Sequence, residues 1–174
     1  IDDNACSIFK ENFNVTPDNR DIREVASKDI PEFDILTGGF PCQSFSAAGK
    51  QRGFNDERGQ LFFEIVRVVE EKQPEIIFLE NVANLLEHDE GKSFLTVYNA
   101  LAPLGYSFKY QVMEPYEYGN LPQIRKRIYI VAVRDDIADH IYQHPEPIEL
   151  TLRSADIIHR GEKQNKVYYY NGSE

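Results

Sequence analysis

The stretch "FDILTGG", residues 33–39, decides the fold class. It is a short apolar run that ends in a glycine pair, a pattern typical of a buried parallel strand that leads into a loop. A second such run, "PEIIFLENV" (74–82), begins at Pro74 and ends in the polar residues Glu80 and Asn81. Between them, "QLFFEIVRVVEEK" (60–72) has apolar residues at helical spacing. The order strand, helix, strand predicts an α/β sheet that is largely parallel.

The sequence on either side continues this alternation. "DDNACSIFKENF" (2–13) predicts a helix that Asp2 or Asp3 can cap, and "GKSFLTVYNALAPLGY" (91–106) predicts one that ends near Pro103 and Gly105. "YSFKYQVM" (106–113) predicts a strand, and a further strand has its core at residues 128–133. After residue 136 the pattern weakens.

Composition excludes several classes of protein. The chain has 174 residues, 41% of them hydrophobic, which is enough for one domain with a core. Its net charge of −10 argues against a wholly basic surface that coats nucleic acid, although a local basic patch is compatible with it. No apolar run approaches the ~18 residues of a membrane span, and the first residues lack the pattern of a signal peptide. Two distant cysteines indicate neither a disulfide framework nor a zinc site, so we expect a reducing cytoplasm and no metal.

Chemically distinct side chains stand at the ends of the predicted strands. Cys42 follows the first strand, Glu80 ends the second, and Arg125 and Arg127 lie at the start of the last. Ligands bind beyond the carboxyl ends of the strands in such sheets. If the last strand runs antiparallel to the others, its start lies at the same edge, and we expect these groups to converge there.

A thiol, a carboxylate and an arginine pair suggest nucleophilic catalysis. The thiolate is the reactive form of cysteine, and nearby positive charge or backbone N–H groups favour it. Residue types alone leave other interpretations open. Cys42 could be an inert buried side chain, Glu80 a helix cap, and "RKR" (125–127) a solvated basic patch.

Three collinear segments resemble a known family. "GGFPCQSFS", "FLENV" and "PQIRKRIYIV" are similar to catalytic motifs of the DNA cytosine-5 methyltransferases, and "KQRGFNDERGQLFFEIVRVVEEKQP" is similar to the bacterial enzymes. The resemblance covers residues 1 to about 147. It implies a Rossmann-like S-adenosylmethionine-dependent methyltransferase fold, truncated at both ends. Residues 1–147 would form the central part of the catalytic domain, and residues 148–174 would lead toward a target-recognition region.

The resemblance implies transfer of a methyl group from S-adenosylmethionine to C5 of a cytosine that is flipped out of duplex DNA. It implies a bacterial restriction–modification system, a cognate endonuclease as a possible partner, and a location in the cytoplasm with the nucleoid. Cys42 would attack C6 of the base, and Glu80 would bond N3 and the exocyclic amine. Arg127 would hold O2, and Arg125 would support the loop and the adduct.

The resemblance also implies contacts to the methyl donor. Asp21 would accept a hydrogen bond from N6 of the adenine, and Ile22 would contact the same ring. Ile1 would give apolar cover at a position where the family often has tryptophan. Pro41 and Leu61 match positions beside the methionine portion or the adenine. Without the resemblance, Asp21 is a turn or cap residue and Leu61 a core residue.

Gln43, Ser44 and Ser46 are suited to phosphate or hinge contacts in a loop that closes on DNA, and are otherwise ordinary polar loop residues.

The sequence departs from the family pattern in what it lacks. No glycine-rich cofactor loop precedes Ile1, and the closing motifs of the family do not follow residue 174. We therefore expect residues 1–174 alone to bind the methyl donor weakly and to turn over little. Two alternatives stay open. One is a tRNA-methylating enzyme of the same fold, against which Phe40 argues because that branch carries a Pro-Pro-Cys-Gln loop. The other is a non-catalytic module that binds nucleic acid or a partner.

Overall fold

The computed structural model describes residues 2–41, 57–137 and 142–157. Its helices are α1 (Asp3–Phe13), α2 (Glu57–Lys72), α3 (Lys92–Leu101), α4 (Pro115–Tyr118) and α5 (Ser154–Ile157), and its strands are β1 (Ile35–Gly39), β2 (Ile76–Val82), β3 (Tyr106–Met113) and β4 (Arg127–Arg134). Short 3-10 helices are η1 (Ile22–Glu24), η2 (Ser27–Asp29), η4 (Ala83–Leu86) and η5 (Ala102–Leu104). The chain forms two units, one of Ile1–Val112 with Lys126–His144 and one of Met113–Arg125 with Pro145–Glu174.

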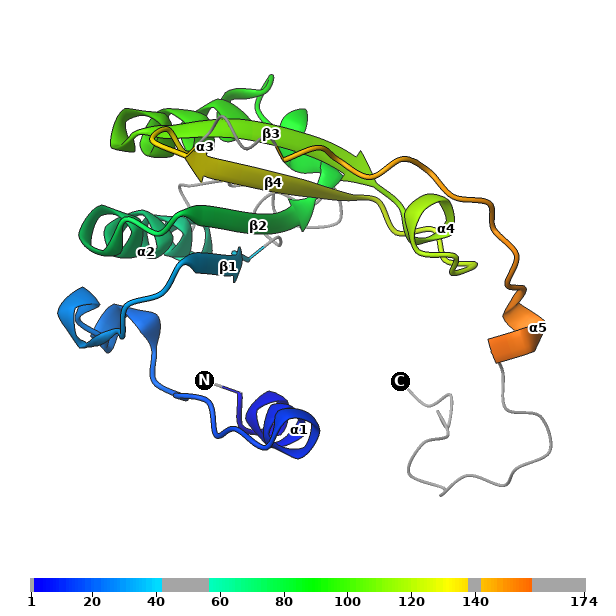
Figure 1. Cartoon of the computed structure of the whole chain (residues 1–174), viewed down its shortest axis with the longest axis horizontal. Coiled ribbons are helices and arrows are strands. Elements are labelled where there is room, and N and C mark those ends of the chain that lie inside the picture. The colour runs from blue at the N-terminus through cyan, green and yellow to red at the C-terminus, as the bar shows by residue number, and fades with distance from the viewer. Residues whose placement is uncertain (1, 42–56, 138–141, 158–174) are drawn as a thin grey trace. The chain divides into compact units, whose positions relative to one another are not determined.

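The four strands form one sheet in the order β1-β2-β4-β3 (Figure 1). β1 and β2 are parallel, and β2 and β4 are antiparallel. Figure 1 also shows β3 and β4 running in opposite directions. The expectation of a largely parallel sheet is therefore wrong for the described strands. Only the β1–β2 pair is joined through a long helix, α2, whereas β3 and β4 are consecutive neighbours that need no crossover.

One face of the sheet carries the core. The register pairs Ile77 with Ala132 and Leu79 with Ile130, and all four are almost fully buried. Buried side chains of α2 and α3 complete this cluster, among them Phe62, Val69, Val97 and Leu101. Side chains alternate between the faces of a strand, so Phe78 and Glu80 point to the opposite face. Glu80 is thus held on that face by its buried neighbours in β2, Leu79 and Asn81.

The helices begin and end near the predicted residues. Asp2 caps α1 by accepting bonds from the backbone amides of Asn4 and Ala5, which confirms the predicted cap. Gly105, with φ of 86°, follows η5 and stops the α3 segment at the predicted place. None of the residues in α1 is buried, and its apolar side chains Ile8 and Phe13 are 61% and 65% exposed.

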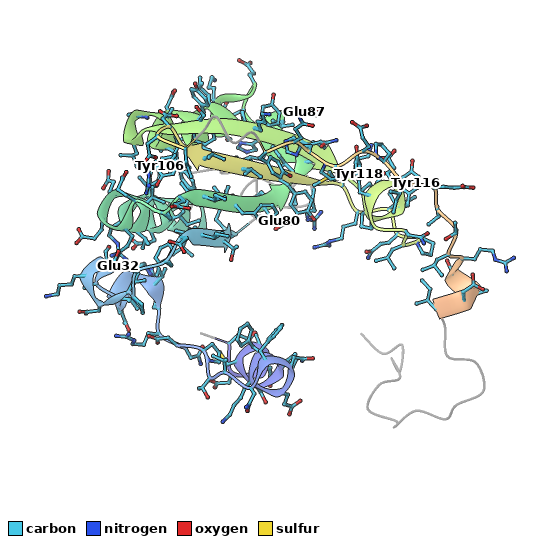
Figure 2. The ribbon with its side chains drawn as sticks, in the orientation of Figure 1. Glu32, Glu80, Glu87, Tyr106, Tyr116 and Tyr118 are labelled. Carbon is cyan, nitrogen blue, oxygen red and sulfur yellow. The ribbon has the colours of Figure 1, made fainter. Side chains whose placement is uncertain are left out.

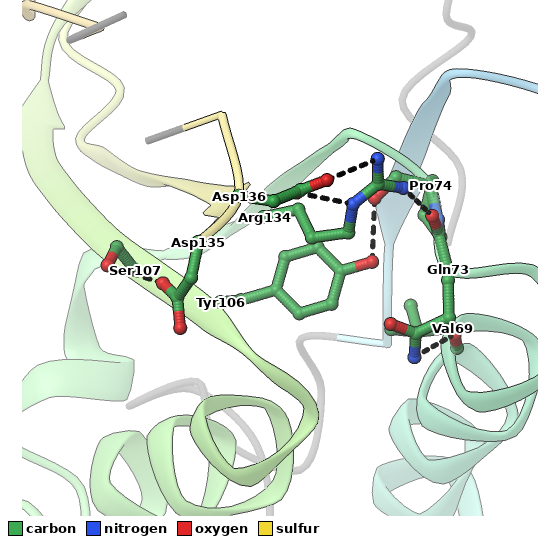
Figure 3. A network of polar contacts seen from close by, with 8 residues as sticks. All are labelled: Val69, Gln73, Pro74, Tyr106, Ser107, Arg134, Asp135 and Asp136. Atoms are coloured by element: carbon green, nitrogen blue, oxygen red, sulfur yellow. Dashed lines mark hydrogen bonds and ion pairs between the residues drawn. The ribbon is translucent and has the colours of Figure 1, made fainter. Parts of the chain in front are cut away.

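A polar network fixes the edge of the sheet where β2 and β3 begin and β4 ends (Figure 3). The Tyr106 hydroxyl donates to the Pro74 carbonyl at 2.6 Å, and the Arg134 guanidinium donates to the neighbouring Gln73 carbonyl. Arg134 also pairs with Asp136, at 2.7 Å between Nε and Oδ1. The turn between α2 and β2 is therefore bonded to the first residue of β3 and the last residue of β4.

Hydrogen bonds to the Asn120 side chain connect the two segments of the second unit. Its side-chain oxygen accepts bonds from the backbone amides of Thr151, at 2.7 Å, and Leu152, at 3.1 Å. The Ile148 amide donates to the Glu117 carbonyl at 2.7 Å. These bonds join the residues after α4 to the extended segment before α5.

Candidate functional site

The candidate site lies at the edge of the sheet opposite the Tyr106 network. Gly39, the last residue of β1, pairs with Glu80 of β2. Because β4 runs antiparallel to β2, its first residue, Arg127, pairs with Val82 at this same edge. We expect the predicted site residues to converge if the last strand is antiparallel. Because β4 is antiparallel to β2, this condition is met for the strands that carry Glu80 and Arg127.

Glu80 and Arg127 form an ion pair at this edge, with 2.8 Å between Oε1 of Glu80 and Nε of Arg127. Tyr129 lies opposite Glu80, which makes Arg127 its diagonal neighbour on the same face. The Arg127 side chain is 17% exposed and that of Glu80 38% exposed. Figure 2 labels Glu80 near the ends of β1 and β2. Arg127 Nη1 also donates to the Lys126 carbonyl at 2.8 Å. The pair is therefore half-buried and rigidly oriented, yet open to a ligand.

Glycine at position 39 leaves room beside this pair. A Cβ atom built on Gly39 would lie 3.5 Å from Oε2 of Glu80, in ordinary van der Waals contact. Gly38 is tighter, because a Cβ there would lie 3.2 Å from Cδ1 of Ile65 and 3.3 Å from a methyl carbon of Leu79. Gly38 thus lets α2 approach β1 on one face, whereas a methyl group at residue 39 would only touch the Glu80 carboxylate on the other.

Asn81 is a site residue that sequence reasoning missed. Its side chain is 1% exposed, and its Nδ2 donates to the Phe40 carbonyl at 3.2 Å. Its Oδ1 accepts from the Val82 amide at 2.8 Å. Phe40 is buried against Phe62, with 5.2 Å between ring centroids. Asn81 and Phe62 therefore fix the backbone and the side chain of Phe40, where the chain leaves β1 toward residue 42. The available signal was an amide beside Glu80 in a strand whose other residues are apolar.

A cavity of about 590 Å³ runs along β1. It is lined by Ile22, Ile30, Phe33, Ile35, Leu36, Thr37, Gly38, Gly39, Phe40, Pro41, Leu61, Glu64, Ile65 and Val68. Three residues predicted to contact a methyl donor, Ile22, Pro41 and Leu61, are brought together in this lining. Because the lining includes every residue from 35 to 41, the cavity reaches the edge of the sheet where Glu80 lies.

Asp21 stands beside this cavity as the cap of η1. Its Oδ1 accepts from the amide and Nε of Arg23, at 2.9 and 3.0 Å, and its Oδ2 accepts from Nη2 at 2.6 Å. These bonds, with the guanidinium contributing most, lower the pKa of Asp21 to about 2. The side chain is therefore a fixed carboxylate, which is the form that accepts hydrogen bonds.

The structure does not test the remaining predicted site residues. Cys42, Ile1, Gln43, Ser44 and Ser46 lie outside the described residues. Arg125 is exposed and belongs to the second unit.

Within the described ranges, no three His, Cys, Asp or Glu residues are grouped so that they could hold a metal ion. No described helix has both the length and the apolar character needed to cross a membrane.

Comparison with known proteins finds one matching family model. The model of the C-5 cytosine-specific DNA methylases matches residues 1–172. The Type II methyltransferase M.Bsp6I of Bacillus sp. (strain RFL6) is 45% identical over 170 residues, which is 97% of this chain and 54% of that protein. The Type II methyltransferase M.HhaI of Haemophilus parahaemolyticus is 44% identical over 154 residues, covering 88% of this chain and 46% of that protein. The chain spans about half the length of the curated relatives it matches.

The fold is similar to that of solved methyltransferase structures. The structure of the Entamoeba histolytica methyltransferase EhMeth superposes with a TM-score of 0.64 at 21% identity, over 86% of this chain and 47% of that one. This likeness supports the Rossmann-like methyltransferase fold that the sequence predicts.

Proposed function

Because the chain belongs to the C-5 cytosine-specific DNA methylase family, we propose that it carries the catalytic centre of an enzyme that methylates C5 of cytosine in duplex DNA. The observation that carries this proposal is the Glu80–Arg127 pair at the edge where β1 leads toward Cys42. The relatives named above are Type II methyltransferases, which favours a restriction–modification system over the tRNA-methylating alternative.

The Glu80–Arg127 pair suits the polar edge of a cytosine ring. That edge offers, side by side, an exocyclic amine, N3 and the carbonyl O2. A carboxylate accepts hydrogen bonds and a guanidinium only donates them. Glu80 therefore bonds the amine and a protonated N3, and Arg127 donates to O2. When a thiolate adds at C6, negative charge develops toward N3 and O2. The N3 proton that Glu80 holds neutralises this charge, and the Arg127 guanidinium stabilises the part on O2.

Cys42 is the proposed nucleophile. Its thiolate forms a bond to C6, and the displaced electron pair of the C5–C6 double bond makes C5 nucleophilic. After C5 receives the methyl group, loss of its proton restores the double bond and expels the thiolate. Arg125 supports the loop and the adduct. The base must be flipped out of the duplex, because C6 cannot be reached while the base is stacked.

S-adenosylmethionine supplies the methyl group as an electrophile in this reaction. The β1 cavity fits it, since about 590 Å³ lies within the ~300–1,000 Å³ of small-molecule sites. Ile22, Leu61 and Pro41 give apolar cover, and Ile1 extends it. Asp21 accepts from the adenine amine. Because the lining of the cavity continues to Pro41, past the residue of β1 that pairs with Glu80, a methyl donor bound there would lie near the proposed place of the base.

The DNA contacts and cellular setting are part of the same proposal. Gln43, Ser44 and Ser46 bond the DNA backbone in a closing loop, and residues 148–174 lead toward a target-recognition region. We assign the activity to the bacterial cytoplasm at the nucleoid, together with a cognate restriction endonuclease.

Trapping with 5-fluorocytosine tests the proposal. Fluorine replaces the C5 proton, so the thiolate cannot be eliminated after methyl transfer. The protein encoded by the complete reading frame, mixed with S-adenosylmethionine and 5-fluorocytosine duplex DNA, should give a complex that withstands SDS electrophoresis. Cys42→Ser should abolish it, and Cys6→Ser, which changes the other cysteine, should retain it. An SDS-stable complex with Cys42→Ser would disprove the assignment of the nucleophile.

A further inference from the structure

Arg67 of α2 bonds to Glu64 on its own helix and to two groups that lie 40 and 45 residues earlier in the chain. Its Nε pairs with Oε2 of Glu64 at 2.8 Å. Its Nη1 donates to Oγ of Ser27 at 2.6 Å, and its Nη2 donates to the Ile22 carbonyl at 2.9 Å. Ser27 begins η2 and Ile22 begins η1. The guanidinium therefore attaches both short helices to α2.

The partners of Arg67 border the β1 cavity. Ile22 and Glu64 are both in its lining, and Asp21 precedes Ile22 as the cap of η1. The three bonds leave the guanidinium from different nitrogen atoms, which uses the planar, fixed donors of arginine. A lysine ammonium at the same place is a point charge on a flexible stem and cannot reproduce this geometry.

We propose that Arg67 is a positioning residue that sets Asp21 and Ile22 against the adenine ring and so determines the preference of the cavity for adenine. This inference rests on the proposed function, which assigns the cavity to S-adenosylmethionine. Arg67 acts through the Ile22 carbonyl and the Ser27 hydroxyl.

The hydrogen bonds that Asp21 already makes explain why its position favours adenine over hypoxanthine. Each carboxylate oxygen has about two acceptor sites. Oδ1 uses both on the amide and Nε of Arg23, whereas Oδ2 accepts one bond from Nη2. Among the donors of the described residues only Nη2 reaches Oδ2, so one acceptor site on this oxygen is open to a donor of the ligand. The adenine amine is such a donor, whereas hypoxanthine presents a carbonyl oxygen that the carboxylate repels.

NMR-detected titration of the 174-residue chain with adenosine and with inosine tests the inference. We expect the wild-type chain to bind adenosine about tenfold more tightly or better, the effect of one hydrogen bond to a charged group. In Arg67→Met the ratio of the two dissociation constants should fall toward one. Arg67→Lys should fail to restore it, and Ser27→Ala, which removes one bond, should give an intermediate ratio.

The matched control is Glu32→Gln. Glu32, labelled in Figure 2, pairs with Lys72 of α2 at 2.6 Å and lies on the same connection, between η2 and β1. We expect this variant to keep the wild-type ratio, because it weakens a bond to α2 without releasing Ile22.

Hydrogen exchange provides a readout that needs no ligand. The Glu24 and Val25 amides donate to the Asp21 and Ile22 carbonyls, at 2.9 and 3.2 Å. They should exchange faster in Arg67→Met and Ser27→Ala than in Glu32→Gln.

The possible outcomes are distinct. Folded Arg67→Met with an unchanged adenosine preference would overturn the inference, as would unchanged exchange at Glu24 and Val25. If Arg67→Met does not fold, the same two measurements on Ser27→Ala test the inference. A wild-type chain that does not distinguish adenosine from inosine would overturn the assignment of the cavity and this inference with it. The exchange data would still show whether Arg67 holds η1, so the two failures can be told apart.

Discussion

At the scale of single residues, Asn81 links β2 to Phe40, the residue that follows β1. Asn81→Asp keeps the size of the side chain but replaces the Nδ2 donor to the Phe40 carbonyl with an oxygen that repels it. Leaving a buried carbonyl without its partner costs about 1–3 kcal/mol, and we expect urea unfolding to show a loss of this size.

Asn12 provides a matched control for Asn81. Its Nδ2 also donates to a backbone carbonyl, that of Ile8, at 2.8 Å, but on the exposed helix α1. Asn12→Asp should change the free energy of unfolding by less than about 0.5 kcal/mol, as for surface changes generally. Equal losses in the two variants would contradict a special role for Asn81.

Two Asp-x-Arg units stand in series, Asp18 with Arg20 and Asp21 with Arg23. In each, the arginine lowers the pKa of the aspartate from 3.8 to about 2, mainly through the guanidinium hydrogen bonds. Because the folded-state pKa is lowered, the stabilisation is complete above pH 3.8 and is lost as the pH falls through 2. In Arg23→Gln, carbon-detected NMR should find the pKa of Asp21 returned toward 3.8, while Asp18 stays near 2. An unchanged Asp21 would show that Arg23 is not the cause.

At the scale of elements, Tyr106 connects β3 to the turn between α2 and β2. Burial raises its pKa from 10.0 to about 12. The neutral phenol therefore stabilises the fold fully below pH 10, and this contribution is lost as the pH rises through 12. Tyr106→Phe leaves the Pro74 carbonyl unbonded and should cost about 1–3 kcal/mol at neutral pH, with a flatter alkaline dependence.

Tyr110, on the same strand, is the control for Tyr106. Its side chain is 49% exposed, and thermal unfolding of Tyr110→Phe should differ little from wild type. A comparable loss in both variants would mean that the Pro74 bond contributes nothing specific.

Packing of α2 on β1 depends on the absence of a side chain at residue 38. Gly38→Ala puts a methyl group 3.2–3.3 Å from Ile65 and Leu79, and overpacking of this kind costs about 1–3 kcal/mol. Gly39→Ala places its methyl group in ordinary contact with Glu80 and should leave the free energy of unfolding nearly unchanged in urea titrations. The reverse order of the two losses would disprove this account.

The sequence predicts the elements well and their arrangement less well. The pattern of apolar residues located β1, β2, β3 and β4. This pattern does not determine whether β4 runs parallel or antiparallel to β2, because an apolar run is compatible with both orientations. The Glu80–Arg127 pairing depends on that direction. Asn81 was missed because its partner, Phe40, lies 41 residues earlier in the chain.

At the scale of the whole molecule, the described cavity offers partners for only one end of S-adenosylmethionine. Ile22, Leu61 and Pro41 can cover an adenine, and Asp21 can accept from its amine. The described lining contains no Lys or Arg to pair with the carboxylate of the methionine portion, and its one charged residue, Glu64, is already bound to Arg67. We therefore expect calorimetry on residues 1–174 to find weak binding, with similar dissociation constants for S-adenosylmethionine and adenosine.

The comparison of two ligands makes this last prediction independent of absolute affinity. If the methionine portion has no partner in these 174 residues, adding it to adenosine should change the dissociation constant by less than about threefold, well under the tenfold that one 1.4 kcal/mol interaction gives. In the protein from the complete reading frame, the dissociation constant of adenosine should exceed that of S-adenosylmethionine at least tenfold if further residues hold the methionine portion. Micromolar binding of S-adenosylmethionine by the 174-residue chain, with a clear preference over adenosine, would show instead that the described residues, or those between 42 and 56, already hold both ends of the molecule.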